Sequence, residues 1–420
     1  MNHSLNETKG VQKPTSEAVQ PTDGVREALA VTLRGIEELI PQDDWVKKLA
    51  RSEATGVPLR IKLGLDPTAP DIHIGHTVVL NKMRQLQDLG HQVIFLIGDF
   101  TSLIGDPSGR NNTRPPLTPE QIKANAETYY KQASLVLDPA KTEIRYNSEW
   151  SLPLGSMGMI QLAAKYTVAR MMERDDFNKR FKDGRSISVH EFLYPLMQGY
   201  DSVALKSDLE LGGTDQKFNL LVGRHLQQEY GQEPQCILTM PLLEGLDGVD
   251  KMSKSKNNYI GISEDPNTMF AKVLSISDTL MWRWFTLLSF KSEAEIASLR
   301  KEVEGGRNPK DAKVMLAKEI TARFHNAGAA DAAEQDFINR SKGGVPDEIP
   351  EVLLAGAPLG IGALLKMAGL APSTSEASRL IDGGGVRVDS SVVGDKGLKL
   401  AAGTYVVQVG KRKFARVHLS

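Results

Sequence analysis

The sequence predicts an α/β fold in which a domain built on a parallel β-sheet precedes an α-helical domain and a small α+β domain. Three observations predict it: a strand–helix–strand pattern over residues 59–97, helical spacing of apolar residues between about 281 and 325, and a helix pair followed by strands after residue 361. A chain of 420 residues has room for two or three such domains, each with its own core.

The composition of the chain excludes several classes of protein. The 51 basic and 52 acidic side chains nearly cancel, so the total charge neither indicates nor excludes a nucleic-acid partner. Cys236 is the only cysteine, which rules out disulfides and cysteine-rich zinc sites and suits a reducing compartment. No apolar run is long enough to span a bilayer, and the N-terminus lacks a hydrophobic signal core. We therefore expect a cytoplasmic protein with no membrane partner and no metal held by the protein alone.

Polar and turn-rich stretches divide the chain. Residues 1–24 are polar with little periodicity, which predicts a flexible tail. The stretch from Ser341 to Pro350 combines glycine, proline and charge, which predicts a linker. The expected order is a tail at 1–24, the parallel-sheet domain at 25–260 with an insertion at about 160–190, a helical domain at 261–335, a linker at 336–352 and the α+β domain at 353–420.

The first strand–helix–strand unit has the clearest pattern. Leu59 to Leu65 is apolar at every second position, which predicts a strand that Asp66, Pro67 and Thr68 terminate. Helical spacing follows from Val79 to Leu86 until Gly90, a glycine suited to a helix end, and the apolar run 93–97 predicts a second strand. This βαβ unit predicts a Rossmann-like nucleotide-binding domain, in which the helix N-terminus above the sheet binds anions.

Two histidines stand at the start of the expected helix. His73 and His76 can donate hydrogen bonds to phosphate oxygens as charge develops in a transition state, and Gly75 lets a nucleotide approach the backbone closely. The alternative is a pair of surface histidines with no ligand. We favour nucleotide binding because a second phosphate-binding pattern occurs downstream.

That second pattern is a lysine pair in a polar, turn-rich stretch. Lys251 and Lys254 follow Gly245 and Gly248 and precede Asn257, so we expect them in a loop. A mobile loop that closes over a triphosphate would bring cations to the charge that a nucleotidyl transfer must neutralise. A solvated basic loop is the alternative.

Four segments of the chain resemble a known family of enzymes. His73-Ile74-Gly75-His76 and Lys251-Met252-Ser253-Lys254-Ser255, in this order, resemble the two signatures of the class I aminoacyl-tRNA synthetases. The segments Tyr194 to Asp201 and Gly212 to Gln216 resemble the tyrosyl-tRNA synthetases, in particular a divergent second bacterial type. The resemblance covers nearly the whole chain after the first two dozen residues. It implies a homodimeric enzyme that activates L-tyrosine with ATP and Mg²⁺ and transfers the tyrosyl group to tRNA(Tyr).

The resemblance also implies roles for individual residues. The phosphate-stabilising catalytic residues would be His73, His76, Lys251 and Lys254. The residues that hold ATP and the adenylate would be Asp66, Thr68, Gly75, Gly213, Asp215, Met252, Ser253 and Ser255. The residues that bind tyrosine would be Asp106, Tyr194 and Gln198 at the ammonium group, Asp201 at the phenol hydroxyl and Gln216 at the carboxyl group. This suits the chemistry, because an ammonium ion requires oxygen acceptors and a buried phenol requires a hydrogen-bond partner.

These residues also have structural alternatives, and one position departs from the family. Asp106 lies in a turn-like sequence, Asp215 could cap a helix, and Tyr194 could be a core aromatic residue. Where better-known members carry a tyrosine that contacts the phenol, this chain has Lys62, and strand alternation on the side of Gly64 leaves open whether Lys62 reaches the pocket. A tryptophan-activating enzyme is therefore the alternative within the class. A non-catalytic RNA-binding protein with a synthetase-like body is the alternative outside it.

The segment from Tyr166 to His190 is crowded with basic side chains. They are Arg170, Arg174, Lys179, Arg180, Lys182 and Arg185. By the resemblance, this is the connective region that forms the dimer and neighbours the tRNA acceptor arm. Val168, Met171 and Met172 give it an apolar side for a partner subunit. A solvated helix of a monomer is the alternative.

Helical spacing continues after the lysine pair. Apolar periodicity predicts helices over residues 281–288, 292–303 and 310–325, which resemble the anticodon-recognising part of the family. The aromatic residues of the first helix are Trp282, Trp284 and Phe285. They could stack on bases, but at this spacing in an apolar segment we assign them to the core.

The C-terminal pattern predicts a separate RNA-binding module. Short helices are expected from Ile361 to Ala368 and from Ser375 to Ile381, the second capped by Ser375, before strands Val386 to Val388 and Thr404 to Val409. This order resembles the domain of the small-subunit ribosomal protein S-four. The expected RNA-binding side chains are Arg379, Arg387, Lys411, Arg412 and Lys413, whose charge suits phosphates. A solvated basic tail is the alternative.

Overall fold

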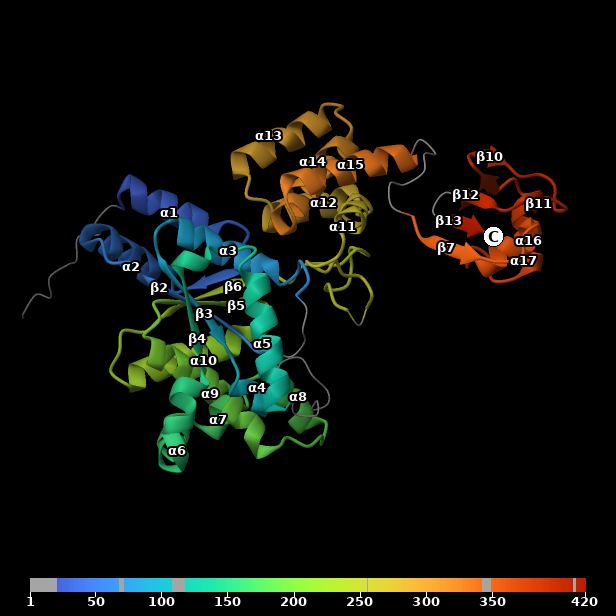
Figure 1. Cartoon of the computed structure of the whole chain (residues 1–420). Helices are drawn as coiled ribbons and strands as arrows, with labels where there is room; N and C mark the ends of the chain where they lie inside the picture. The colour runs from blue at the N-terminus through green and yellow to red at the C-terminus, as the bar shows by residue number, and fades with distance from the viewer. Residues whose placement is uncertain (1–20, 68–71, 108–117, 255, 342–348, 411–412) are drawn as a thin grey trace, which may run out of the picture. The chain divides into compact units, whose positions relative to one another are not determined.

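The computed structural model describes residues 21–67, 72–107, 118–254, 256–341, 349–410 and 413–420. The chain separates into two compact units, residues 1–243 and 244–420 (Figure 1). The boundary between them falls before residue 260, where we predicted the end of the sheet domain. Several predicted features lie outside the described residues: most of the tail, Thr68, Ser255, Lys411, Arg412 and part of the linker.

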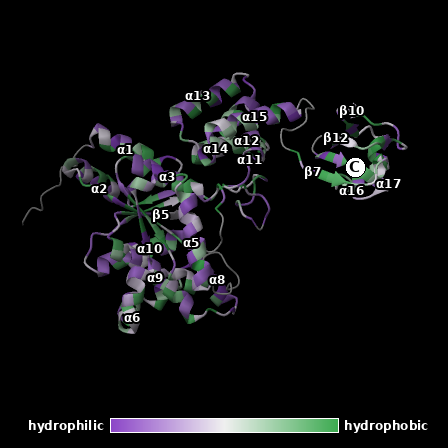
Figure 2. Cartoon of the chain, viewed as in Figure 1, coloured by the Kyte–Doolittle hydropathy of each residue, from purple (hydrophilic) through white to green (hydrophobic). Residues whose placement is uncertain are grey.

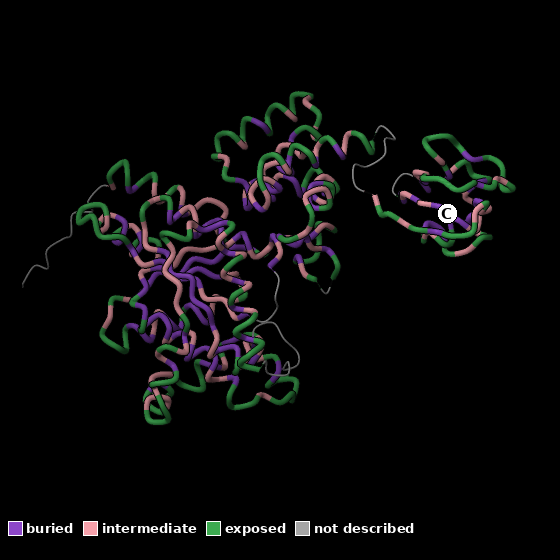
Figure 3. The backbone as a smooth tube through the Cα atoms, viewed as in Figure 1, coloured by how far each residue is buried: buried purple, intermediate pink, exposed green. Residues whose placement is uncertain are grey.

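Within the described part of the first unit, six strands form one sheet in the order β1-β6-β5-β2-β3-β4. They are β1 Glu38–Ile40, β2 Arg60–Leu65, β3 Gln92–Ile97, β4 Thr142–Tyr146, β5 Leu209–Gly213 and β6 Cys236–Met240. All paired neighbours are parallel except β1, which runs antiparallel to β6. The central strands are hydrophobic (Figure 2) and buried (Figure 3), as in parallel sheets covered by helices. The predicted parallel-sheet α/β domain is thus confirmed.

Helices pack around this sheet. They are α1 Asp23–Leu33, α2 Gln42–Thr55, α3 Thr77–Asp88, α4 Thr101–Ile104, α5 Pro119–Ala133, α6 Ser148–Ala163, α7 Val168–Met171, α8 Asp175–Lys182, α9 Val189–Leu205 and α10 Lys217–Glu229. The predicted βαβ unit corresponds to β2, α3 and β3, and Gly90 follows α3 with a positive φ of 90°, as expected for a helix end. The predicted tail is wrong at its end, because Thr22 caps α1 and the helix starts at Asp23.

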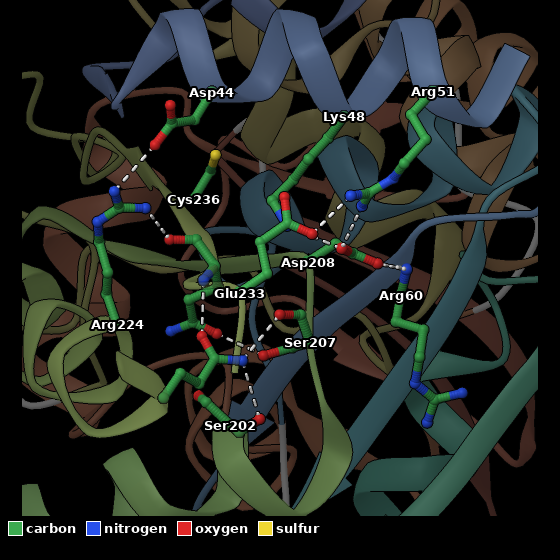
Figure 4. Close-up of polar contacts among 12 residues, drawn as sticks. Asp44, Lys48, Arg51, Arg60, Ser202, Ser207, Asp208, Arg224, Glu233 and Cys236 are labelled. Atoms are coloured by element: carbon green, nitrogen blue, oxygen red, sulfur yellow. Dashed lines mark hydrogen bonds and ion pairs between the residues drawn. The ribbon is translucent and has the colours of Figure 1, made fainter. Parts of the chain in front are cut away.

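A network of paired charges joins α2 to the amino ends of β2 and β5 (Figure 4). Lys48 of α2 is 2% exposed, and its Nζ lies 2.9 Å from Asp208 Oδ1 and 3.2 Å from Glu233 Oε1. Arg51 also bonds Glu233, at 2.5 Å. Burial raises the pKa of the Cys236 thiol to about 12, so this cysteine stays protonated beside the network.

The second unit begins with helices. They are α11 Pro266–Leu274, α12 Asp278–Leu288, α13 Glu293–Glu304, α14 Pro309–Phe324 and α15 Ala327–Ser341. Trp284 and Phe285 are fully buried, which confirms their assignment to the core. Trp282 is only half-buried and stacks on Phe285. The predicted linker is too long at both ends, because α15 runs through an alanine-rich stretch to Ser341 and a strand begins at Glu351.

The C-terminal part of this unit combines two helices with two small sheets. The helices are α16 Ile361–Met367 and α17 Thr374–Asp382. A five-stranded sheet in the order β10-β9-β12-β13-β7 is accompanied by the pair β11-β8. The strands are β7 Glu351–Leu354, β8 Leu359–Gly360, β9 Val386–Val388, β10 Ser391–Val392, β11 Lys399–Leu400, β12 Gly403–Val409 and β13 Lys413–Leu419.

The predicted helix pair and the strands around 386 and 404 are confirmed here, with two corrections. Ser373, not Ser375, caps α17: its Oγ accepts a hydrogen bond from the Glu376 N–H at 3.2 Å, because the helix starts earlier in the run of hydroxyl residues. The basic C-terminal stretch is also no simple tail. Lys413 starts a strand that pairs with both β12 and β7. Across all the residues that the structure describes, no helix is both long and apolar enough to cross a bilayer.

Candidate active site

A cavity of about 210 Å³ opens at the carboxyl ends of β2 and β5. In an open parallel sheet, ligands bind at this edge where the strand order reverses. Among the lining residues are seven that the sequence predicted: Asp66, Asp106, Tyr194, Gln198, Asp201, Gly213 and Gln216. They come from the segments that follow β2, α4 and β5, from the end of β5 and from α9. The fold therefore brings together the five residues predicted to bind tyrosine and two of those predicted to bind the nucleotide. Asp215 is exposed beside Gly213.

The Asp66 and Asp106 carboxylates provide acceptors for a cation in the cavity. The Tyr194 hydroxyl donates to Asp66 Oδ2 at 2.9 Å, and the Thr101 hydroxyl donates to Asp66 Oδ1 at 2.7 Å. Burial raises the pKa of the Asp66 carboxyl to about 7, against these two hydrogen bonds and with added repulsion from Asp106. Gln216 Nε2 donates to Asp106 Oδ2 at 2.9 Å. An ammonium group placed here would relieve the repulsion between the carboxylates.

Asp201 holds the other acceptor position. Its Oδ1 accepts from Trp150 Nε1 at 2.8 Å, and its Oδ2 accepts from Asn147 Nδ2 at 3.3 Å. Burial raises the pKa of this carboxyl to about 7, although Lys62 and both hydrogen bonds oppose the rise. Asn147, Trp150 and Thr101 were not predicted from the sequence. Their positions just after β4 and β3, at the same carboxyl edge of the sheet, are the signal that could have identified them.

The lack of a side chain at Gly98 leaves room for the Asp66 carboxylate. A Cβ atom at Gly98 would overlap both the Asp66 carboxylate and the Thr101 hydroxyl. Gly98 follows β3 directly and lines the cavity. Gly98 was not among the residues predicted from the sequence.

Lys62 points into the protein and not outward. Its side chain is fully buried, and its Nζ lies 2.9 Å from Glu210 Oε1. It also donates to Ser202 Oγ at 2.9 Å and to the Gln198 carbonyl at 3.2 Å. Lys62 lies beneath α9 and is not among the residues that line the cavity.

Two arginines of the basic segment also point inward, which corrects their expected place in a region that forms the dimer and neighbours the tRNA acceptor arm. Arg174 is 5% exposed, with Nε 2.7 Å from Asp176 Oδ1 and Nη2 3.6 Å from Asp106 Oδ1. Arg180 makes a bidentate ion pair with Glu191. These arginines pair with carboxylates that are partly or fully buried, since a guanidinium matches a carboxylate in geometry. The exposed basic residues of the segment are Arg170, Lys179, Lys182 and Arg185.

His73 and His76 lie between β2 and α3, with ring centroids 3.9 Å apart. The His73 N–H donates to His76 Nδ1 at 3.2 Å. An accepting Nδ1 places the proton of a neutral imidazole on Nε2, which can then donate outward. Ile74 is fully buried between the two histidines and fixes the turn. Gly75 is half-buried at the turn.

The lysine pair lies in a non-regular segment of the second unit, as predicted. Lys251 and Lys254 are exposed, whereas Met252 is buried beneath them. Asn258 holds this segment: its Oδ1 accepts from the Ser253 N–H at 2.8 Å, and its Nδ2 donates to Asp247 Oδ2 at 2.7 Å. These hydrogen bonds hold the segment that carries the two exposed lysines. Its mobility stays a prediction.

Comparisons with known proteins agree with this geometry. The model of the family described as tRNA synthetases class I (W and Y) matches residues 54–341, and that of the S4 domain matches residues 363–404. The tyrosine–tRNA ligase of Cupriavidus pinatubonensis is 74% identical over 399 residues, which cover 95% of this chain and 97% of that protein. The tyrosine–tRNA ligase of Ralstonia nicotianae is 75% identical over 392 residues, covering 93% of this chain and all of that protein.

Solved structures share the fold at lower identity. The tyrosyl-tRNA synthetase of Archaeoglobus fulgidus, complexed with L-tyrosine, is 24% identical with a TM-score of 0.60 and covers 73% of this chain and 99% of its own. A tryptophanyl-tRNA synthetase from Encephalitozoon cuniculi is 16% identical with a TM-score of 0.56 and covers 73% of this chain and 92% of its own. The fold alone thus does not separate the two amino acids, whereas the close relatives do. The chain belongs to the tyrosine–tRNA ligase family of class I aminoacyl-tRNA synthetases.

Proposed function

We propose that this enzyme activates L-tyrosine with ATP to tyrosyl-adenylate and pyrophosphate, and then transfers the tyrosyl group to the terminal ribose of tRNA(Tyr). One observation carries the proposal. The cavity is lined by the Asp106 and Asp66 carboxylates, which suit an ammonium group, and by the hydrogen-bonded Asp201 carboxylate, which suits a phenol. The resemblance placed Asp66 at the nucleotide, and we now propose it for the ammonium group. An amino acid with a para-hydroxyl group satisfies both kinds of carboxylate.

The chemistry requires no nucleophilic side chain. The tyrosine carboxylate forms the new bond to the α-phosphorus of ATP, and the bond to pyrophosphate breaks. In the second step, a ribose hydroxyl of tRNA attacks the acyl carbon and AMP leaves. The protein contributes orientation and charge stabilisation: His73 and His76 donate to phosphate oxygens, and Lys251 and Lys254 neutralise the leaving pyrophosphate.

Magnesium accompanies the nucleotide in this proposal. Mg²⁺ is bound largely through substrate phosphates and water in enzymes of this kind of chemistry. Among the described residues, no group of three or more His, Cys, Asp or Glu side chains is arranged to hold a metal ion.

Gly213 and Asp215, at the end of β5, are proposed to hold the adenylate ribose.

A second copy of the chain is the proposed partner of the exposed apolar side chains on α6 to α9. They are Leu152, Met157, Ile160, Val168, Phe181 and Val189, each more than 60% exposed. Exposed apolar side chains of this kind are covered in a symmetric dimer. Met171, which we expected to face a partner subunit, instead packs into the core of its own subunit, since it is 3% exposed.

The C-terminal module is proposed to bind tRNA through phosphates. Arg379, Arg387 and Lys413 are exposed on it and are the described members of the predicted cationic set. Such contacts position RNA more than they read its sequence. The cytoplasmic location stays a prediction from the sequence.

The test is amino-acid-dependent ATP–pyrophosphate exchange on the purified chain, with tyrosine, phenylalanine and tryptophan tested separately and without tRNA. Exchange with tyrosine alone supports the proposal. Exchange with tryptophan would favour the tryptophan-activating alternative. No exchange with any amino acid would favour a non-catalytic RNA-binding protein.

A further inference from the structure

A buried ion pair beneath the cavity has no part in the chemistry proposed above. Lys62 on β2 and Glu210 on β5 face each other in the parallel register of the sheet and are 0% and 1% exposed. Burying two charges has a large desolvation cost, and an apolar pair of similar volume is often at least as stable. Stability alone therefore gives no reason for an ion pair at this place.

The contacts of Lys62 lead to the helix that carries the substrate-facing residues. Its Nζ donates to the Gln198 carbonyl at 3.2 Å and to Ser202 Oγ at 2.9 Å. Ser202 Oγ in turn donates to Glu210 Oε2 at 2.9 Å, and Gln235 Nε2 donates to the same oxygen. Ser202 is thus fixed on both sides, next to Asp201 in the chain.

We propose that the Lys62–Glu210 pair is a positioning device for tyrosine recognition, in which Lys62 fixes α9 between Gln198 and Ser202 and favours the ionised form of the Asp201 carboxylate. An anionic Asp201 accepts a hydrogen bond from the substrate phenol more strongly than a neutral carboxyl group does. Lys62 acts through Asp201 and does not touch the substrate. This inference rests on the tyrosine-activating function proposed above.

The charges around Asp201 explain why the pair would matter. Lys62 attracts the carboxylate and lowers its pKa, whereas Glu210 repels it and raises its pKa. The other titratable residues that line the cavity are Asp66, Asp106 and Tyr194, and Asp66 and Tyr194 interact electrostatically with Asp201. With burial acting in the same direction as Glu210, Lys62 is the cation that opposes protonation of Asp201.

The test is the pH dependence of kcat/KM for tyrosine in ATP–pyrophosphate exchange, between about pH 5.5 and 8.5, on the full chain. For the wild type, kcat/KM falls as the pH drops through the pKa of Asp201, because a protonated carboxyl group is a poor acceptor. In Lys62→Met, we expect the midpoint of this fall to move up by about one pH unit, which is about a tenfold loss of kcat/KM on the acid side. The value of kcat at saturating tyrosine should change by less than about threefold.

Glu210→Gln is the partner variant, because it keeps the size of the side chain and removes one negative charge. We expect the midpoint to move in the opposite direction, to lower pH. Lys48→Met is the matched control: it removes another buried lysine of the same domain, which pairs with Asp208 and Glu233 at the amino end of the sheet. It should lower Tm and leave the midpoint unchanged.

Opposite displacements in Lys62→Met and Glu210→Gln support the inference, and Glu210→Gln alone tests the sign if Lys62→Met does not fold. Unmoved midpoints, or displacements in the same direction, would overturn it. A shift in Lys48→Met as large as that in Lys62→Met would also overturn it, because the effect would then reflect lost stability. A wild type without tyrosine-dependent exchange would refute the proposed function itself.

Discussion

The carboxylates at the two ends of the central sheet have different kinds of partner. At the amino ends of β2 and β5, carboxylates face cations: Asp208 and Glu233 lie against Lys48 and Arg51 (Figure 4). At the carboxyl ends, Asp66 and Asp201 receive hydrogen bonds from neutral donors, and burial raises the pKa of each to about 7. The paired charges at the amino ends stabilise the fold. The carboxylates at the carboxyl ends can bind an ammonium group and a phenol.

This difference teaches how to separate residues that serve stability from those that serve function. A charged group that already has a partner is stabilised little by a ligand. A carboxylate whose pKa is raised by burial is stabilised in its ionised form when a ligand supplies the missing partner. Substitutions at the two ends should therefore have opposite effects on stability and activity.

The largest expected effect comes from removing a phosphate donor at the carboxyl end. In His73→Ala, adenylate formation should slow by about 10²- to 10³-fold, because a positioned donor is lost where charge develops. The dissociation constant for tyrosine should stay nearly the same. Rapid-quench measurement of adenylate formation, with equilibrium dialysis of tyrosine, checks both values. Equal losses in both would contradict the division of roles between His73 and the tyrosine pocket.

Asp201→Asn should reduce the preference for tyrosine over phenylalanine by about 10²-fold, the loss expected when a hydrogen bond to a charged acceptor is weakened. At pH 8 the variant should be at least as stable as the wild type, because a buried carboxylate has been neutralised. Pyrophosphate exchange with both amino acids and urea denaturation provide the measurements. An unchanged preference would remove Asp201 from phenol recognition.

Lys48→Met, at the amino end of the sheet, should lower stability and leave activity unchanged. It should lower the free energy of unfolding by about 2 kcal/mol, less than for a fully buried pair because Glu233 is half-exposed. The kinetic constants for tyrosine should be unchanged. Urea denaturation followed by pyrophosphate exchange tests this, and a loss of activity in the folded variant would refute the separation of the two ends.

The smallest expected effect, counted for each pH unit, is on the pH dependence of stability. The pKa of Asp201 in the folded protein, about 7, lies above its usual 3.8, so the folded state binds a proton more readily than the unfolded state. Stability from this group should rise as the pH falls from about 8 to 5, by up to about 1 kcal/mol per pH unit.

Other groups titrate in the same range, among them His91, whose pKa is lowered by burial and which acts in the opposite sense. The difference in unfolding free energy between wild type and Asp201→Asn cancels them. We expect that difference to shrink as the pH falls. A difference independent of pH would show that Asp201 is ionised equally in both states.

Local patterns in the sequence predicted the features that depend on neighbouring residues. Alternation and helical spacing identified β2, α3 and β3, and the motifs placed His73 and Lys251 in loops. Pairings between distant segments could not be predicted. The direction of Lys62 depends on Glu210, which lies 148 residues away in the chain, and the support of Asp201 depends on Trp150. The same holds for Arg174, whose basic neighbourhood suggested a place near tRNA but which contacts the distant Asp106 as well as the neighbouring Asp176.

The most direct test of this account is calorimetric titration of the enzyme with tyrosine at pH 7, in two buffers that differ in ionisation enthalpy. If the substrate ammonium and phenol meet Asp66 and Asp201, binding favours their ionised forms and lowers their pKa values, so protons are released to the buffer. We predict an observed enthalpy that differs between the buffers by the release of up to about one proton per site. An enthalpy independent of the buffer, or proton uptake, would contradict the claim that these carboxylates form the tyrosine site.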